Sequence, residues 1–461
     1  MSDIHTSIRY LQSLITDPEG KRYFVTKTPD RRLREFKEQL ARTADFLSFA
    51  GQPQHQYRTI HVAGTSGKSS VTTILAAILT HCGFRTGHHV SPYLQTPNEK
   101  LIVNGKMITD AAFARLVDRF RELHQAWGAS RSPQPRLRYG EAWVALTYLW
   151  FAMQRVDWAV IETGVGGRYD PTNVLDPHIA VITNIHYDHT NILGDTLPQI
   201  AAHKAGIIQP NRPALTAETK PAALQVIQAE AARQNAPLYV LGRDFDYTIH
   251  RTTPHGSTFT VHAPHHIYPD LHIPLLGRFQ PLNAAVAIAA LDVLERARDT
   301  LHTAHNRLTP EALRAALAGV RFPGRLEIVR RQPTVILDGA HNPHKMRSLA
   351  SSLRQLFPAR RFTVLFGSLL IKDAAAMLRA LLPLAGRFIF APNPVYGKPG
   401  MTPQALAAAL HRLAPDVPVE LADSVQDGIQ RGLAALPPDG HLLITGSIYF
   451  VGAARAVVGK R

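Results

Sequence analysis

The sequence predicts an α/β protein: a P-loop domain with a mainly parallel sheet and a small antiparallel sheet, followed by a Rossmann-like C-terminal α/β domain. Three observations predict this fold. At residues 58–79 a β-branched strand leads into a glycine loop and directly into an apolar-periodic helix. Buried-type strands then alternate with helical patterns, as in a parallel sheet. A second alternation starts near residue 306, so we divide the chain into residues 1–300 and 301–461.

Composition limits the classes of protein and partner. The 461-residue chain is too long for one core, and 45% hydrophobic with 19% charged residues is typical of a globular protein. The net charge of +16 favours anionic partners such as nucleotides and acidic small molecules. The basic residues form no stripe interleaved with aromatic residues, so we expect no nucleic-acid partner.

With the single cysteine Cys82 the chain cannot form an intrachain disulfide, as is typical of proteins in the reducing cytoplasm. The N-terminus lacks a basic segment followed by an apolar run, and no apolar stretch approaches the ~18 residues of a membrane span. We therefore expect a cytoplasmic protein without a membrane segment. No self-complementary helix stripe stands out, and we expect a monomer.

The glycine loop after the first strand predicts a phosphate-binding site. Its glycines let backbone N–H groups approach phosphate oxygens, the helix N-terminus adds positive potential, and a lysine reaches the outer phosphates. A serine hydroxyl can hold Mg²⁺. The alternative is a plain glycine turn between strand and helix. The predicted nucleotide-binding residues of the loop are Gly64, Thr65, Ser66, Gly67, Lys68, Ser69 and Ser70.

Two strands should deliver acidic groups to the same edge of the sheet. Helical patterns fill residues 1–57, 110–127 and 141–153, and a strand with an Asn-Gly turn is expected at 99–106. The strand at 158–161 ends at Glu162, and the strand at 179–183 leads to Asp188 and His189. Ligands bind at the carboxyl ends of parallel strands. Glu162 needs a metal or a cation if it is buried. For His189 a buried structural histidine is an alternative, because Mg²⁺ rarely takes imidazole.

The rest of the chain completes the two domains. A helix at 197–205 should precede strands at 206–208 and 214–215, and short alternating runs at 244–276 predict the antiparallel sheet. A helix at 283–296 leads to a polar hinge at 299–310. Four strands, at 334–337, 362–366, 387–390 and 442–445, belong to the second domain. Because this domain lacks a glycine fingerprint after its first strand, a dinucleotide role is disfavoured.

Seven ordered segments, covering residues 58–453, resemble the folylpolyglutamate synthase and dihydrofolate synthase family of the Mur ligase superfamily. They are HVAGTSGKSS, SPYLQTPNEKLIVNGK, DWAVIETGVGGRYDPTN, ITNIHYDHTNILGDTLPQIAAHKAGII, FPGRLEIV, ILDGAHNP and LLITGSIYF. Only 57 residues precede the P-loop strand, too few for the UDP-binding domain of cell-wall Mur ligases. This favours the folate branch.

The resemblance implies an ATP-dependent ligase that phosphorylates a folate-type carboxylate and joins it to L-glutamate. It implies Mg²⁺, as two ions, held by Ser69 or Ser70, Ser91, Glu162, His189 and a carbamylated Lys204. Lys68, Lys204, Asp338 and His341 are the implied catalytic residues, and Asn283, Arg325 and Asp338 the implied nucleotide contacts beyond the loop. The implied substrate-binding residues are Tyr139, Glu141, Arg168 and Asp170. Domain closure should assemble the site.

Some residues depart from the family pattern. Gly140 stands where an aromatic residue often covers the pterin, and His203 replaces the glutamate common before the lysine. The N-terminal segment lacks the Leu-Gly-Leu-Glu-Arg pattern of enzymes that take dihydropteroate. Two alternatives therefore stay open: the same chemistry with a non-folate acceptor, and a nucleotide-binding protein without ligase activity. The acceptor itself, dihydropteroate or tetrahydrofolate, is left open.

Overall fold

A computed structural model describes residues 3–19, 28–296 and 308–459. Within these residues the first domain has an eight-stranded sheet in the order β4-β3-β2-β5-β1-β6-β7-β8, parallel from β2 to β8. Its strands are β1 Arg58–Ala63, β2 Thr86–His89, β3 Ile102–Val103, β4 Lys106–Met107, β5 Trp158–Glu162, β6 Ile179–Ile182, β7 Ala214–Thr216 and β8 Leu238–Val240. The P-loop strand β1 thus lies between the two strands that were expected to carry acidic groups.

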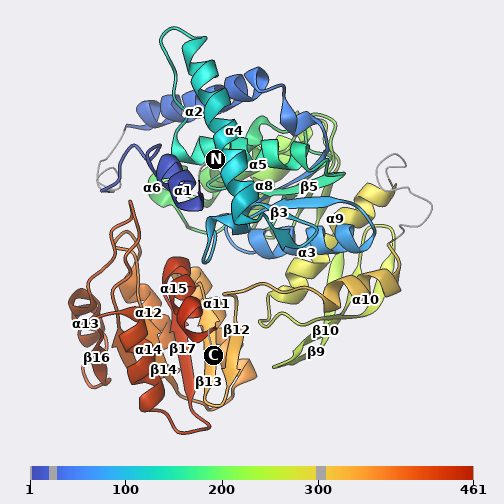
Figure 1. Cartoon of the computed structure of the whole chain (residues 1–461). Helices are drawn as coiled ribbons and strands as arrows, with labels where there is room; N and C mark the ends of the chain where they lie inside the picture. Colours follow the sequence, from blue (N-terminus) through green and yellow to red (C-terminus); the bar gives the residue numbers. More distant parts are fainter. Residues whose placement is uncertain (1–2, 20–27, 297–307, 460–461) are drawn as a thin grey trace.

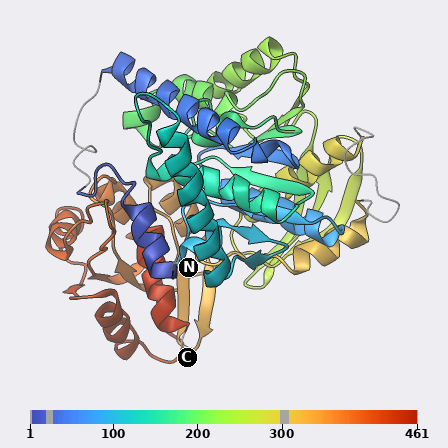
Figure 2. The same ribbon diagram turned by 45° about the horizontal axis from the view of Figure 1, so that its top comes forward.

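Helices cover both faces of this sheet because its strands are apolar on both sides. On β5, Trp158 and Val160 face a core with α3 and α9, whereas Ala159 and Ile161 face a core with the N-terminal helices. Figure 2 shows the long helices α2 and α4 over the second of these faces. The helices are α1 Ile4–Gln12, α2 Pro29–Phe49, α3 Lys68–His81, α4 Asp110–Ala129, α5 Tyr139–Met153, α6 Thr190–Leu193, α7 Leu197–Ala205, α8 Pro221–Arg233 and α9 Gln280–Arg296.

The small antiparallel sheet consists of β9 Asp246–Thr253, β10 Gly256–His262 and β11 Ile267–Ile273. It packs on α9, and Phe259 and Leu271 are buried in the same core as that helix. The helix α10 Pro310–Ala318 joins this core through Leu313 and Leu317. The predicted division at residues 300 and 301 and the predicted hinge up to residue 307 lie outside the described residues.

The second domain has a six-stranded sheet in the order β12-β13-β17-β14-β15-β16, and Figure 1 shows it in orange and red below the first domain. Its elements are β12 Glu327–Arg331, β13 Thr334–Asp338, α11 Pro343–Leu356, β14 Phe362–Phe366, α12 Ala374–Leu381, β15 Ala385–Phe390, α13 Pro403–His411, β16 Val419–Leu421, α14 Val425–Ala434, β17 His441–Thr445 and α15 Ile448–Val458. The predicted fold class is confirmed. The sheet gains two edge strands, β12 and β16, that were not predicted.

One strand prediction was wrong, and a second strand is shorter than predicted. Gly206 caps α7, and the apolar residues Ile207 and Ile208 that follow are buried against α7 and α8 instead of pairing in a sheet. The strand expected at residues 99–106 begins later than predicted, because a 3-10 turn, Pro97–Lys100, precedes it. Its Asn-Gly turn is present: residues 104 and 105 connect the antiparallel strands β3 and β4. Among the described residues, no helix combines the length and apolar composition needed to cross a bilayer.

Candidate active site

Two glycines let the P-loop approach its neighbours closely. Gly64 (φ 145°) follows β1, and Gly67 (φ 85°) precedes the first residue of α3. A Cβ on Gly64 would lie 1.8 Å from Thr183 Oγ1, and one on Gly67 would lie 2.5 Å from Asn283 Oδ1. The Thr183 hydroxyl in turn donates to the Ser66 carbonyl at 2.7 Å. The loop is therefore packed between β6 and α9, and side chains at these two positions would displace it.

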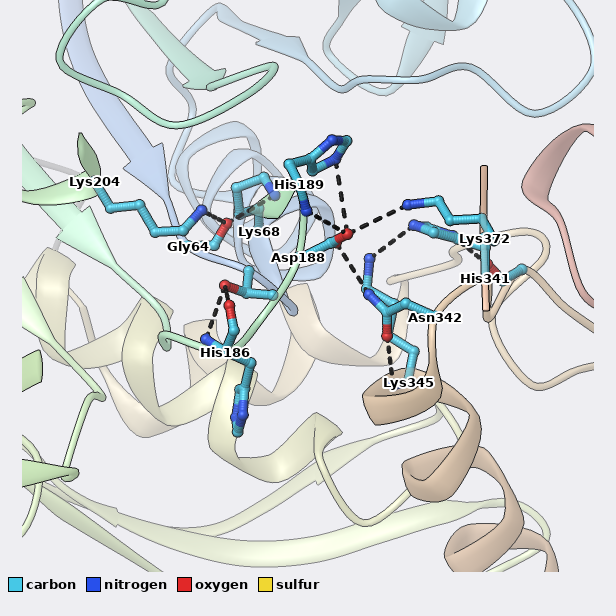
Figure 3. Close-up of polar contacts among 12 residues, drawn as sticks. Gly64, Lys68, His186, Asp188, His189, Lys204, His341, Asn342, Lys345 and Lys372 are labelled. Atoms are coloured by element: carbon cyan, nitrogen blue, oxygen red, sulfur yellow. Dashed lines mark hydrogen bonds and ion pairs between the residues drawn. The ribbon is translucent and has the colours of Figure 1, made fainter. Parts of the chain in front are cut away.

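Two lysines converge on one carbonyl oxygen of the loop. Lys68 Nζ donates to Gly64 O at 2.9 Å, and Lys204 Nζ donates to the same oxygen at 2.7 Å (Figure 3). Lys204 is only 4% exposed, and this burial, with the charge of Lys68, lowers its pKa well below the usual value. The positive charge of Lys68 beside the loop favours an anion such as a phosphate at this place.

Glu162 connects the P-loop helix to the loop after β2. Its Oε1 accepts a hydrogen bond from Ser69 Oγ at 3.0 Å, and its Oε2 accepts one from the Ser91 backbone N–H at 3.1 Å. Lys68 Nζ is 3.9 Å from Oε1. The side chain is 2% exposed; burial raises the pKa of Glu162, and Lys68 and the two hydrogen bonds oppose this effect. A buried carboxylate beside a serine hydroxyl offers the hard oxygen ligands that Mg²⁺ prefers.

Asp188 is one of the residues through which the first domain contacts the second. Asn342 Nδ2 donates to Asp188 Oδ2 at 3.0 Å, and Lys372 Nζ is 3.3 Å from Oδ1 (Figure 3). Burial favours a higher pKa of Asp188, but His189, Lys372 and Lys345 together hold that pKa below its usual range. The neighbouring His189 has left-handed backbone geometry (φ 51°) and donates its N–H to Asp188 Oδ1.

The side chain of His189 is 37% exposed, so the alternative of a buried structural histidine is disfavoured. Its Nε2 lies 4.0 Å from Asp188 Oδ1. The ring is partly desolvated, which lowers the pKa of His189 to about 4, and a neutral ring has a nitrogen lone pair for a metal.

The predicted residues of the second domain gather after β13. Asp338 ends this strand and accepts hydrogen bonds from the Leu326 and Ala340 backbones at 2.9 and 2.8 Å. Burial raises the pKa of Asp338, and the nearby Arg325 opposes the rise. His341 follows two residues after Gly339 and bonds to its carbonyl. These residues face the P-loop domain across the contact at Asp188.

The four predicted substrate-binding residues hold structural elements together. Glu141, 1% exposed, pairs with Arg42 Nη2 at 2.6 Å, and Arg168 Nη2 lies 2.9 Å from Glu230. Asp170 accepts hydrogen bonds from the Val165 and Thr172 backbones and from the Thr172 hydroxyl. Tyr139 begins α5, and burial raises the pKa of its hydroxyl. Their role in binding substrate stays a prediction.

Two lysines of the site were not predicted from the sequence. Lys372 reaches Asp188, and Lys345 Nζ lies 3.1 Å from His341 Nε2. The position of Lys345 could have been noticed in the sequence, because it lies in the first turn of the helix that begins at Pro343 after the N-cap Asn342. Cations are unfavourable near a helix N-terminus, so a lysine there indicates another demand on the residue. Lys372 lies in a loop and carried no such signal.

Comparison with known proteins identifies both halves of the chain. Residues 62–291 match the Mur ligase middle domain, and residues 324–448 match the Mur ligase glutamate ligase domain. The dihydrofolate synthase/folylpolyglutamate synthase of Bacillus subtilis is 35% identical over 424 residues, covering 91% of this chain and 94% of that protein.

Solved structures resemble the whole chain. The Mycobacterium tuberculosis folylpolyglutamate synthase complexed with ADP superimposes with a TM-score of 0.83 at 32% identity, covering 92% of this chain and 95% of the other. The Escherichia coli FolC in complex with DHPP and ADP also gives 0.83, at 27% identity, covering 100% and 99%. The similarity thus extends over both domains and the contact between them.

Proposed function

Because this chain belongs to the folylpolyglutamate synthase and dihydrofolate synthase family of the Mur ligases, we propose that it uses both dihydropteroate and reduced folates as acceptors. It is an ATP-dependent ligase that adds L-glutamate to a folate-type carboxylate. The double specificity is supported by the two activities in the name of the Bacillus subtilis relative. The Escherichia coli structure with DHPP supports the dihydropteroate half.

One observation supports the chemistry: Glu162 connects Ser69 and Ser91 beside Lys68 of the P-loop. A carboxylate is a poor electrophile, so phosphoryl transfer from ATP to the acceptor is needed before an amine can attack. Lys68 would bind the outer phosphates. The loop would hold the remaining phosphates through its backbone N–H groups.

The carboxylate and hydroxyl oxygens around Glu162 fit Mg²⁺, which would neutralise the charges that must meet during phosphoryl transfer. We assign the metal to Ser69, Ser91, Glu162, His189 and a carbamylated Lys204, with two ions in total. The hydrogen bond from Ser69 to Glu162 supports Ser69 over Ser70 as the P-loop ligand. A Ser69→Ala variant should therefore need more Mg²⁺ for activity than a Ser70→Ala variant.

Carbamylation of Lys204 requires a neutral amine, and the lowered pKa of this buried side chain supports it. The change would place an anionic oxygen ligand beside the positively charged Lys68. After incubation with ¹³C-bicarbonate, the protein should show a carbamate ¹³C signal that is lost in Lys204→Ala. Lys100 is a second buried lysine, whose pKa burial lowers to about 8, and Lys100→Ala should keep the signal. A signal that survives Lys204→Ala would rule out this assignment.

The acceptors are tested by phosphate release from ATP with Mg²⁺ and L-glutamate. Dihydropteroate, tetrahydrofolate and a diglutamylated folate are supplied separately, and turnover is expected with each. Turnover with the folates alone would restrict the enzyme to chain extension. If the protein binds ATP but releases no phosphate with any of the three acceptors, the alternative of a non-folate acceptor is favoured. We also propose that the enzyme acts as a monomer in the cytoplasm, which sedimentation of the purified protein and fractionation of cells would test.

A further inference from the structure

Lys345 is held at the domain contact in a defined hydrogen-bonding state. His341 Nδ1 lies 2.8 Å from the Gly339 carbonyl oxygen, and because a carbonyl only accepts, Nδ1 carries the hydrogen. The other ring nitrogen, Nε2, is then an acceptor. Lys345 Nζ lies 3.1 Å from Nε2 and donates one hydrogen to it (Figure 3). A neutral Lys345 in this arrangement keeps its lone pair free.

The surroundings of Lys345 favour the neutral amine. Burial, helped by the neighbouring cations and opposed by Asp188, lowers the pKa of Lys345 to about 7. At neutral pH a large fraction of the side chain is therefore unprotonated. The titratable groups that interact with it from the elements around are Lys68, Asp188, His189, Lys204, Arg325, Asp338, His341, His344 and Lys372.

The ligase reaction requires a proton acceptor that the residues assigned so far do not supply. L-Glutamate arrives with an ammonium group, which has no lone pair for attack on a carbonyl carbon. Lys68 and the P-loop serve the phosphates, and Glu162 serves the metal. Asp188 already accepts from Asn342 and Lys372 and has a lowered pKa, so it is a poor base.

We propose that Lys345 takes the proton from the incoming ammonium group of L-glutamate, while His341 holds the Lys345 amine in place; this inference rests on the proposed function. The freed amine forms a C–N bond to the acyl carbon. The C–O bond to phosphate then breaks, and its electron pair leaves with the phosphate. The remaining extra proton on nitrogen passes to the phosphate, which leaves as hydrogen phosphate, and Lys345 returns its proton to water.

This base belongs to the second domain, whereas Lys68 and the phosphate-binding loop belong to the first. Near the site the two domains meet where Asp188 accepts hydrogen bonds from Asn342 and Lys372 and where the ring of His186 stacks on that of His344. The amine is therefore deprotonated only when the domains meet. Free amine is not generated before the acyl phosphate is enclosed, and water is kept from that intermediate.

A different role for Lys345 would be a fixed cation that binds a carboxylate of glutamate. The two roles differ in their tolerance of arginine. Arginine keeps a positive charge at all relevant pH values and cannot act as a base. Lys345→Arg therefore preserves a carboxylate contact but removes a proton acceptor.

The experiment separates the two chemical steps with hydroxylamine. Hydroxylamine is neutral at pH 7 and attacks an acyl phosphate without a base, so hydroxamate formation reports the first step alone. In Lys345→Met and Lys345→Arg, hydroxamate formation from ATP and acceptor should stay within about threefold of wild type. Glutamate ligation should fall by at least about a hundredfold, the usual contribution of a general base. Arg354→Met, an exposed position on the same helix, should leave both rates unchanged.

The pH profile adds a second readout. The rate of glutamate ligation by the wild type should fall about tenfold per pH unit below pH 7 and level off above it. The rate of hydroxamate formation should not show this decrease at acidic pH. An equal loss of both activities in Lys345→Met would overturn the proposal, as would recovery of glutamate ligation in Lys345→Arg. If wild type forms no hydroxamate with any acceptor, the proposed function itself fails, and this inference with it.

Discussion

The ion pair between Arg42 and Glu141 should stabilise the first domain more than any exposed pair. Arg42 donates from Nη2 to Oε1 at 2.6 Å and from Nε to Oε2 at 3.2 Å, and it thereby joins α2 to α5. Glu141 is 1% exposed and Arg42 20%. Removing one partner of a buried pair costs about 3–5 kcal/mol, because the other charge is left unpaired. Since Arg42 retains some solvent contact, we expect Arg42→Met to lower the free energy of unfolding by about 3 kcal/mol.

The second partner provides the control. Glu141→Gln removes the carboxylate that Arg42→Met leaves unpaired. The double variant Arg42→Met/Glu141→Gln should therefore recover about 2 kcal/mol of the lost free energy of unfolding. Urea denaturation followed by tryptophan fluorescence measures both values, and KM for the acceptors is measured in parallel. If Arg42→Met costs less than about 0.5 kcal/mol, the pair is not structural and the reasoning fails. A tenfold rise in acceptor KM for Glu141→Gln at unchanged stability would instead support the predicted substrate contact.

Three further outcomes follow from the site and the core. Glu162→Gln should lower kcat at least about a hundredfold and raise the Mg²⁺ requirement, and unchanged Mg²⁺ titrations would contradict its role as a ligand. His61 and His89 are buried with pKa values lowered to about 3, so the unfolded chain binds more protons below pH 6.5, and each should cost about 1.4 kcal/mol of stability by pH 5.5. A flat urea midpoint between pH 7.5 and 5.5 would refute this. Asp188→Asn removes the ion pair with Lys372 and should lower kcat/KM at least about tenfold; X-ray scattering with a non-hydrolysable nucleotide and acceptor should show less compaction than wild type.

The P-loop and the strand ends could be predicted from the sequence. The loop is a local pattern: the glycines at 64 and 67 and the lysine at 68 follow each other directly, so backbone preferences over a few residues define it. Glu162 and Asp188 could be placed at one edge of the sheet because parallel strands end on the same side. The alternation of strands and helices likewise predicted both domains.

Local patterns failed where burial has more than one cause. The apolar pair after Gly206 predicted a strand, but it lies beneath two helices. An apolar run indicates removal from water, and a helix covers it as well as a sheet does. The short edge strands β12 and β16 were missed because their alternating burial is weak.

Only the tertiary structure decided which charges meet. Asn342 and Lys372 reach Asp188 across 154 and 184 residues of sequence, and Arg42 reaches Glu141 across 99. Such pairs depend on how two sheets and their helices pack, which no short-range preference specifies. The same packing desolvates Lys204 and Lys345 and so lowers their pKa values. The sequence by itself thus determined the phosphate-binding loop and the order of the elements, whereas the protonation states that the chemistry needs arise from long-range burial.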